Sequence, residues 1–175
     1  MEIGNIKYIE PKFFFIVPYR DRERHLELYL NQMEHVLEDL DYLTLVVHQD
    51  DKRYFNRGAM KNIGFKFLKE NFPKTYKEKT LVFHDVDHVV WKKGILDFDT
   101  VPGVVKHHFG FPENFVKSLG GIVSMNAGDF EKTNGFPNYW SWGYEDNCLY
   151  YRAVKAGLKI DESNLKPPKH PDIIM

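Results

Sequence analysis

Residues 13–22, FFFIVPYRDR, join a run of five large apolar side chains to a proline, a tyrosine and three charged residues. A continuous apolar run of this length predicts a strand buried on both faces and ended by Pro18. Asp21 then stands where a helix N-cap is expected, because apolar residues recur behind it at spacings of three and four: Leu26, Leu30, Met33, Val36, Leu37 and Leu40. The chain therefore opens with a buried strand and an amphipathic helix.

The same alternation of elements continues along the chain. Strands are predicted at 43–48 and 80–84, with a helix from Arg57 to Leu68 between them and a solvated loop at 71–79. The apolar face expected on that helix consists of Met60, Ile63, Gly64, Phe67 and Leu68. Strand–helix–strand–helix–strand over the first 85 residues predicts an α/β fold, a Rossmann-like, mixed but largely parallel sheet flanked by helices.

The second half of the chain adds shorter elements. Strands are expected at 103–107 and 121–125, and a short helix at 127–133 is stopped by Asn134-Gly135. A last helix runs from about Tyr144 to Ala156 and ends at Gly157.

Length and composition narrow the class of protein. The 175 residues predict a single domain, 1–175, and 24 basic against 25 acidic side chains give no electrostatic case for a nucleic-acid partner. The lone Cys148 excludes an internal disulfide framework and a cysteine-based zinc site, and it fits a reducing compartment. The N-terminal residues lack the apolar stretch of a signal peptide, and no apolar run approaches the length of a membrane span, so neither is expected in the sequence as given. We therefore expect a soluble, cytoplasmic chain unless it is excised from a larger membrane-anchored protein.

Charged side chains cluster where predicted strands end. Arg20 and Arg22 follow the first strand, Asp85 and Asp87 follow the third, and Arg57 opens the second helix. Arginines match phosphate, and carboxylates suit Mg²⁺ or Mn²⁺, so these residues together favour a phosphate-bearing ligand with a divalent cation. An Asp-x-Asp pair in a loop and two solvated surface arginines remain the simpler interpretation of each motif alone. A metal-dependent phosphoester hydrolase would also use Asp85 and Asp87.

The most distinctive segment is GFPNYWSWGYED, residues 135–146. Two tryptophans followed by paired carboxylates at a helix start suit a sugar site, because indole faces stack on pyranose rings and a carboxylate can accept a hydroxyl proton. A tryptophan loop packed over the core, with Glu145 and Asp146 favouring the helix N-terminus, explains the same residues. The hydrolase hypothesis leaves this segment unexplained.

Four segments together resemble the β-1,4-galactosyltransferase family of inverting GT-A enzymes. They are FIVPYRDRERHL (15–26), FNRGAMKNIGF (55–65), FHDVDHV (83–89) and GGIVSMNAGDFEKTNGFPNYWSWGYEDNCLYYR (120–152). The resemblance implies a GT-A fold, a Mn²⁺ or Mg²⁺ cofactor, a nucleotide-sugar donor and a carbohydrate or glycan acceptor.

The resemblance also implies a role for each matching residue. The nucleotide pocket would be formed by Pro18, Tyr19, Arg20, Arg22, Phe55, Arg57 and Asp85. Asp87, with Asp85 close by, would hold the metal. Trp142, Gly143 and Tyr144 would lie at the sugars, Asp146 would be the catalytic base, and Glu145 would lie beside it.

Several positions depart from the family pattern. His108 stands where the family has a diphosphate-binding lysine, so we expect it to contact phosphate. Tyr144 replaces the second glycine of the family's Trp-Gly-Gly-Glu-Asp and would place a ring where the donor sugar approaches. The family's metal-binding Met and His follow the last helix, where this chain offers only His170 and Met175. His84 and His88 flank the Asp-x-Asp pair and could assist the metal, although packing beside it is the favoured interpretation.

The function expected is transfer, with inversion, of galactose or a related hexose from a nucleotide-diphosphate donor, first of all a UDP-sugar, to a carbohydrate acceptor. The alternative is a nucleotide or sugar-nucleotide binding protein with little transferase activity, in which Tyr144 and the short C-terminus block catalysis.

Overall fold

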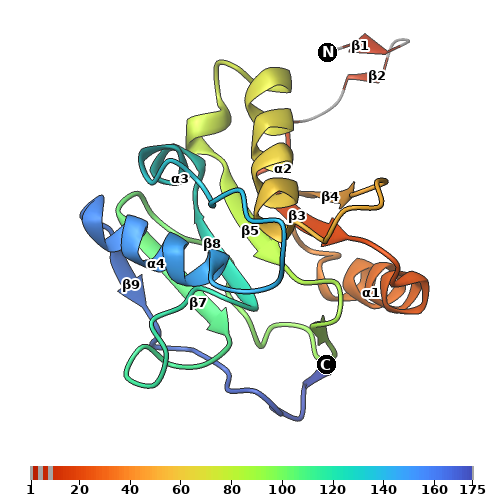
Figure 1. The fold of residues 1–175 in the computed structure, drawn as a ribbon. Coiled ribbons are helices and arrows are strands. Elements are labelled where there is room, and N and C mark those ends of the chain that lie inside the picture. The colour runs from red at the N-terminus through yellow and green to blue at the C-terminus, as the bar shows by residue number, and fades with distance from the viewer. Residues whose placement is uncertain (1, 4–5, 8–9, 175) are drawn as a thin grey trace.

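A six-stranded sheet lies at the centre of the computed structural model, which describes residues 2–3, 6–7 and 10–174 (Figure 1). Its strands follow the order β4 (Tyr42–His48), β3 (Phe13–Tyr19), β5 (Thr80–His84), β8 (Ile122–Asn126), β7 (Val104–Phe109) and β9 (Lys159–Asp161). Only β8 runs antiparallel to its two neighbours. The predicted mixed, largely parallel sheet is therefore confirmed.

The apolar run of β3 supplies both faces of the sheet. Phe13, Phe15 and Val17 point into one core, and Phe14 and Ile16 point into the other, as the period of two in a strand requires. The first core is covered by α1 (Glu23–Val36) and by the small sheet of β6 (Val89–Val90) and β10 (Ile173–Ile174). The second is covered by α2 (Arg57–Asn71), α3 (Ala127–Lys132) and α4 (Glu145–Lys155). The prediction that this strand is buried on both faces is therefore confirmed.

Three details around α1 differ from the prediction. Strand β3 continues through Pro18 to Tyr19, because only β4 pairs with it beyond Ile16 and a missing N–H is tolerated where one edge is free. Asp21 is not the N-cap; its backbone is left-handed, with φ of 48°, and Arg22 takes the cap position without a side-chain hydrogen bond. The helix ends at Val36, so Leu37 and Leu40 lie beyond it.

The predicted apolar faces of the two long helices are partly wrong. Leu30 on α1 and both Ile63 and Phe67 on α2 are exposed. Tyr29 on α1 and Lys61 on α2 are buried instead. Each helix therefore packs through a narrower stripe than the spacing of apolar residues indicates.

Strands β7 and β8 and helices α3 and α4 agree closely with the prediction, whereas the short strands β1 (Glu2–Ile3), β2 (Ile6–Lys7), β6, β9 and β10 were not predicted. Helix α3 stops before Asn134 and Gly135, which are both left-handed, and α4 is followed by the left-handed Gly157. The loop predicted at 71–79 contains a short 3-10 helix, Tyr76–Glu78. Near the N-terminus, β1 and β2 form a separate two-stranded sheet. Among the described residues, no helix combines the length and apolar character needed to cross a bilayer.

One edge of the sheet collects the ends of several elements. Strands β3, β5 and β7 all run in the same direction, so their carboxyl ends meet at this edge, where α2 and α4 also begin (Figure 1). Ligands of open α/β sheets bind at such carboxyl ends. Arg20 and Arg22 lie in the loop after β3, Asp85 and Asp87 in the loop after β5, and Arg57 and Asp146 in the first turns of α2 and α4.

Candidate active site

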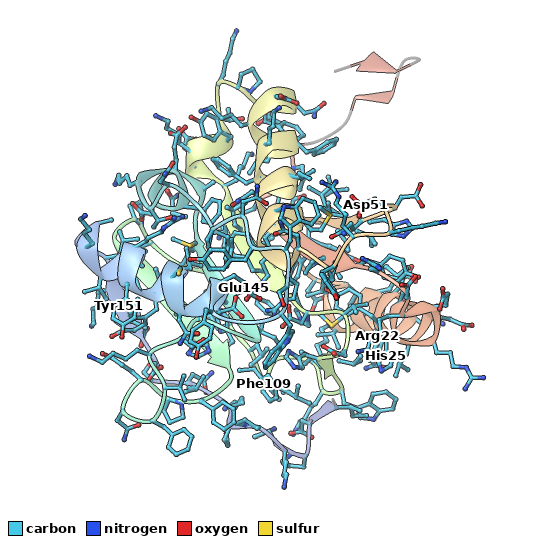
Figure 2. The ribbon with its side chains drawn as sticks, in the orientation of Figure 1. Arg22, His25, Asp51, Phe109, Glu145 and Tyr151 are labelled. Carbon is cyan, nitrogen blue, oxygen red and sulfur yellow. The ribbon has the colours of Figure 1, made fainter. Side chains whose placement is uncertain are left out.

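A cleft of about 460 Å³ opens at this edge of the sheet. Phe109, at the end of β7, lines the cleft, and Figure 2 shows Phe109 together with Glu145 at the start of α4 and the exposed Tyr151 further along that helix. Nine residues predicted for the site line the cleft: Pro18, Arg20, Arg22, Phe55, Arg57, Asp85, Asp87, Trp142 and Asp146. Tertiary structure thus brings together residues from the four separate motifs.

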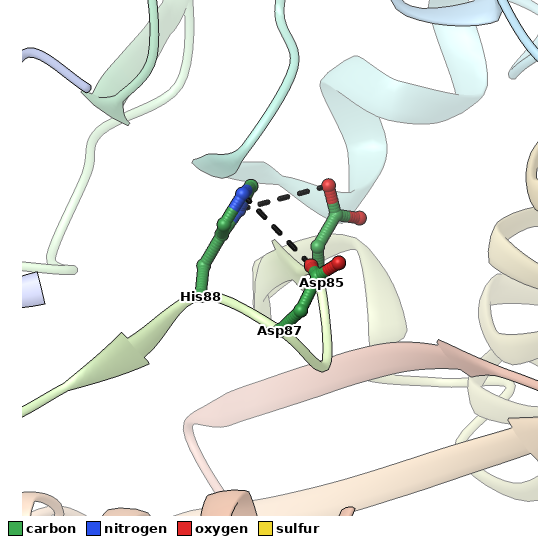
Figure 3. Close-up of side chains that lie close together, drawn as sticks. All are labelled: Asp85, Asp87 and His88. Carbon is green, nitrogen blue, oxygen red and sulfur yellow. Dashed lines mark ion pairs between the residues drawn. The ribbon is translucent and has the colours of Figure 1, made fainter. Parts of the chain in front are cut away.

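An acidic pair and a histidine form one part of the cleft, between β5 and β6 (Figure 3). Ligand atoms of Asp85, Asp87 and His88 all lie within 4.8 Å of one another. The imidazole of His88 is 3.8 Å from Oδ2 of Asp85 and 3.9 Å from Oδ1 of Asp87. His88 therefore belongs to a cluster able to hold a cation, which is the less favoured of the two roles that the sequence left open for it.

Local hydrogen bonds fix the start of α2 and hence the position of Arg57. The side chain of Asn56 caps the helix by accepting a hydrogen bond of 2.9 Å from the backbone N–H of Ala59. The backbone N–H of Asn56 in turn donates to the side chain of Gln49. Gly58 is needed because a Cβ there would lie 2.5 Å from the carbonyl oxygen of Pro137. The first turn of α2 is thereby pressed against the loop that leads into α4.

Arg57 joins three carboxylates from two distant segments. Its Nη2 lies 2.9 Å from Oδ2 of Asp85 and 2.9 Å from Oδ2 of Asp146, and its Nη1 lies 2.9 Å from Oε1 of Glu145. Burial disfavours the charged guanidinium, but the three neighbouring carboxylates outweigh that effect and raise the pKa of Arg57. Arg57 is therefore a permanent cation at the centre of the site.

A second cation, which sequence reasoning missed, completes this group. Lys61 has a side chain that is only 1% exposed, and its Nζ donates a hydrogen bond of 3.1 Å to Oδ1 of Asp146. It also lies 3.8 Å from Oδ1 of Asp85. The available signal was its spacing, because Lys61 follows Arg57 by four residues and so lies on the same helix face.

The two cations keep Asp85 ionised. Burial of this carboxyl group opposes ionisation, but the charges of Arg57 and Lys61, helped by His88, outweigh burial and lower the pKa of Asp85. An ionised carboxylate is the form that binds a metal. The electrostatics thus suit the role in metal binding that the resemblance implies for Asp85.

The paired carboxylates at the start of α4 have different surroundings. Asp146 lines the cleft, whereas Glu145 does not and its buried side chain faces Arg57. Only Asp146 is therefore placed to meet a bound ligand.

Besides Glu145, four residues predicted for the site do not line the cleft: Tyr19, His108, Gly143 and Tyr144. The prediction for His108 is wrong, because its side chain is buried on the other side of β7 and hydrogen-bonds Ser124. His107 lines the cleft instead, since adjacent strand residues face opposite ways and β7 has a register shift after His107. Tyr19 is buried in the core against His48.

Gly143 and Tyr144 also do not line the cleft. The ring of Tyr144 is 78% exposed, and its backbone is left-handed, with φ of 66°. That this exposed ring obstructs the donor sugar stays a prediction from the sequence. Trp142, two residues earlier, does line the cleft and is 87% exposed.

The structure does not support a role in metal binding for His170, one of the two candidates for a further metal ligand. His170 Nδ1 accepts a hydrogen bond from the backbone N–H of Asp172, and His170 is not part of the acidic cluster. Met175 lies outside the described residues.

Family models match nearly the whole chain. Residues 9–95 match the N-terminal region of glycosyl transferase group 7, and residues 102–171 match a second model described as the N-terminal domain of galactosyltransferase. β-1,4-Galactosyltransferase 1 of Bos taurus is 32% identical over 164 residues, covering 87% of this chain. β-1,4-Galactosyltransferase 5 of Sus scrofa is 31% identical over 158 residues, covering 85%. The match spans 39% of the length of each of these relatives.

Solved structures give the same result for the fold. A mutant of Drosophila β-1,4-galactosyltransferase 7, in complex with manganese, UDP-Gal and xylobiose, superposes with a TM-score of 0.79 at 25% identity, over 94% of this chain and 70% of that one. A mannosyltransferase of Pyrobaculum calidifontis, 13% identical, shares the fold with a TM-score of 0.59, over 94% of this chain and 59% of that one. The fold is GT-A, and the chain belongs to the β-1,4-galactosyltransferase family.

Proposed function

We propose that the chain is a metal-dependent inverting glycosyltransferase that moves galactose or a related hexose from a nucleotide-diphosphate donor to a carbohydrate acceptor. One observation carries the proposal: Arg57 links the acidic cluster at Asp85 to Asp146 by contacts of 2.9 Å on each side. A phosphate-binding cation thus lies between a metal-type cluster and a candidate base within one cleft.

The residues present fit a divalent ion. Two cations, Arg57 and Lys61, contact the carboxylates of Asp85, Glu145 and Asp146, and Asp87 lies beside Asp85 in the acidic cluster. These six side chains carry a formal charge of −2 when His88 is neutral. Oδ1 of Asp85 and Nδ1 of His88 are buried without a hydrogen-bond partner. Asp85, Asp87 and His88 would therefore hold Mn²⁺ or Mg²⁺. The chemistry that such an ion supplies is charge neutralisation on the leaving diphosphate.

The cations of the cleft suit the donor. Arg20, Arg22 and Arg57 line it together with Phe55, whose ring offers a face for a nucleobase. The planar guanidinium group of arginine can donate two parallel hydrogen bonds to the oxygens of a phosphate group. We assign these four residues, with Pro18 beside them, to donor binding.

Asp146 is our candidate base. It would accept the proton of the acceptor hydroxyl while that oxygen bonds to C1 of the donor sugar. The bond from C1 to the phosphate oxygen breaks, and the diphosphate leaves with the electron pair. Arg57 and the neighbouring cations would stabilise the negative charge of the leaving diphosphate. A single base is enough for inversion, so we assign Glu145 to the positioning of Arg57 and not to proton transfer. Trp142 offers a stacking face for sugars.

The relative with UDP-Gal and xylobiose supports a UDP-sugar as donor and a glycan as acceptor. That all of 1–175 forms one domain, and that the chain is cytoplasmic, stay predictions from the sequence.

The test is transfer to a panel of saccharide acceptors from UDP-galactose, UDP-glucose, UDP-N-acetylglucosamine and GDP-mannose, each with Mn²⁺ and with chelator. We expect metal-dependent transfer from at least one UDP-sugar and an inverted anomeric centre by NMR. Tight nucleotide binding without transfer from any donor would instead favour the binding-protein alternative.

A further inference from the structure

Lys61 is a buried lysine with no contact to the cleft. Its side chain is 1% exposed, and it is absent from the residues that line the cleft, although Arg57, one turn earlier on α2, lines it. Transferring an ammonium group from water into a protein interior is costly, and the cost is offset only by well-placed partners. The contacts of Lys61 therefore show what it is placed to do.

Those contacts are directed at Asp146. The ammonium donates to Oδ1 of Asp146 over 3.1 Å, lies 3.8 Å from Asp85 and is 4.8 Å from the ring centroid of Phe136, a cation–π contact. Asp146 is the only one of these groups that it hydrogen-bonds. Phe136 thus offers the ammonium an aromatic face, and Asp146 is the nearer of its two carboxylate partners.

The two oxygens of Asp146 have different cations. Oδ2 accepts a hydrogen bond from Arg57, and Oδ1 accepts one from Lys61. Gly120 packs against the same carboxylate, because a Cβ at that position would be 3.1 Å from Oδ2. An anionic ligand in the cleft can reach Arg57 but not Lys61. Lys61 would therefore stay on Asp146 if a ligand drew Arg57 away from it.

We infer that Lys61 is a positioning residue that holds the carboxylate of Asp146 in its cleft-facing orientation through Oδ1, leaving Oδ2 to meet the acceptor hydroxyl. The inference rests on the proposed function, since it assigns Lys61 a role through the candidate base. Lys61 itself touches neither substrate. A rival role, support of Asp85 in the metal cluster, depends on the longer contact of 3.8 Å.

The test compares Lys61→Met, Lys61→Gln, Asp146→Asn and the double variant Lys61→Met/Asp146→Asn in steady-state transfer. Lys66→Met is the matched control, because Lys66 is on the same helix with a side chain 72% exposed. Loss of orientation at a reacting group can cost on the order of 10²-fold, so we expect Lys61→Met to lower kcat by about 10- to 100-fold. The KM for the donor and the Mn²⁺ concentration for half-maximal rate should stay within about threefold of the wild type.

Two further readouts separate positioning from a general structural role. Lys61→Gln keeps a hydrogen-bond donor at similar length, so its kcat should lie between those of the wild type and Lys61→Met, and it serves if Lys61→Met does not fold. In the Asp146→Asn background, Lys61→Met should lower the residual rate by no more than about twofold, because the group that it positions is no longer a base.

Each contrary result has a clear meaning. An unchanged kcat in Lys61→Met and Lys61→Gln, with an active wild type, would overturn the inference alone. A selective change in Mn²⁺ dependence, or equal losses with and without Asp146, would overturn it in favour of a role at Asp85 or in stability. An inactive wild type would overturn the proposed function and, with it, the inference.

Discussion

The guanidinium of Arg57 lies 2.9 Å from the carboxylate of Asp146, although 89 positions separate the two residues in the chain. This contact ties the first turn of α2 to the first turn of α4 at one edge of the sheet. Since Arg57 also contacts Asp85, a single side chain connects the acidic cluster with the candidate base. Stability and function should therefore both respond to changes at Arg57.

Replacing Arg57 by alanine should destabilise the protein strongly. The change leaves Asp85, Glu145 and Asp146 without their shared cation, and removal of one partner from a buried ion pair costs about 3–5 kcal/mol. We expect a loss near the lower end, because 18% of the Arg57 side chain is exposed. Urea denaturation measures the effect, with the exposed Arg24→Ala as control. A loss no greater than that of Arg24→Ala would show that the charge cluster contributes nothing to folding.

Asp87→Ala should abolish the dependence of nucleotide binding on metal. In the wild type we expect Mn²⁺ to tighten UDP binding, and the variant should lose about tenfold of that affinity because a charged ligand to the metal is removed. Calorimetric titration with UDP, with and without Mn²⁺, gives both values. Asp99→Ala is the control, because Asp99 forms an exposed ion pair with Lys12 away from the cleft. Identical Mn²⁺ enhancement in Asp87→Ala would refute the assignment.

Asp146→Asn and Glu145→Gln should differ in their effect on the transfer rate, although the two residues are adjacent. Removing a general base costs roughly 10²–10⁴-fold in rate, so Asp146→Asn should lose most transfer while donor affinity stays within a few-fold. Glu145 does not line the cleft, and Glu145→Gln should lower kcat much less. Single-turnover transfer and UDP titrations of both variants measure the contrast. A larger kcat loss in Glu145→Gln would exchange the two roles.

Tyr144→Gly should raise stability without a large effect on transfer. A left-handed backbone costs a non-glycine residue roughly 1–2 kcal/mol, and the exposed ring of Tyr144 makes little packing to lose. We expect a gain of about 1 kcal/mol in unfolding free energy, after the entropy cost of glycine in the unfolded chain. Tyr144→Ala keeps the strain and should show no gain. If Tyr144→Gly alone created transfer in a silent wild type, the ring would block the site after all.

Acid should destabilise the protein through buried histidines. Burial lowers the pKa of His84 to about 4 and that of His108 to about 3, from an ordinary value of 6.5. Between pH 6.5 and 4 the unfolded chain therefore binds protons that the native state does not, so the unfolding free energy falls as the pH falls. Each histidine contributes a slope of up to about 1.4 kcal/mol per pH unit.

The variant His108→Gln, whose amide does not titrate, isolates one of these contributions. Urea denaturation from pH 7 to pH 4 should show a shallower slope for this variant than for the wild type. An equal slope would mean that His108 is protonated in the native state too.

Most of the fold followed from the sequence alone. The apolar run of β3, the order of strands and helices and the glycines after α3 and α4 were readable because each depends on local chemistry: burial on both faces, helical periodicity and left-handed turns. The placement of charged residues at strand ends was readable for the same reason, since parallel strands bring their carboxyl ends to one edge.

Only tertiary structure decided which side chains meet. The pairing of β7 with β8 placed His107 at the cleft and buried His108 on the opposite face of the strand. The left-handed backbone of Tyr144 put its ring in solvent. The packing of α2 against the loop before α4 buried Lys61 beside Asp146. Strand register, backbone handedness and helix rotation are set by long-range packing, so a pattern of residues fixes the elements but not these contacts.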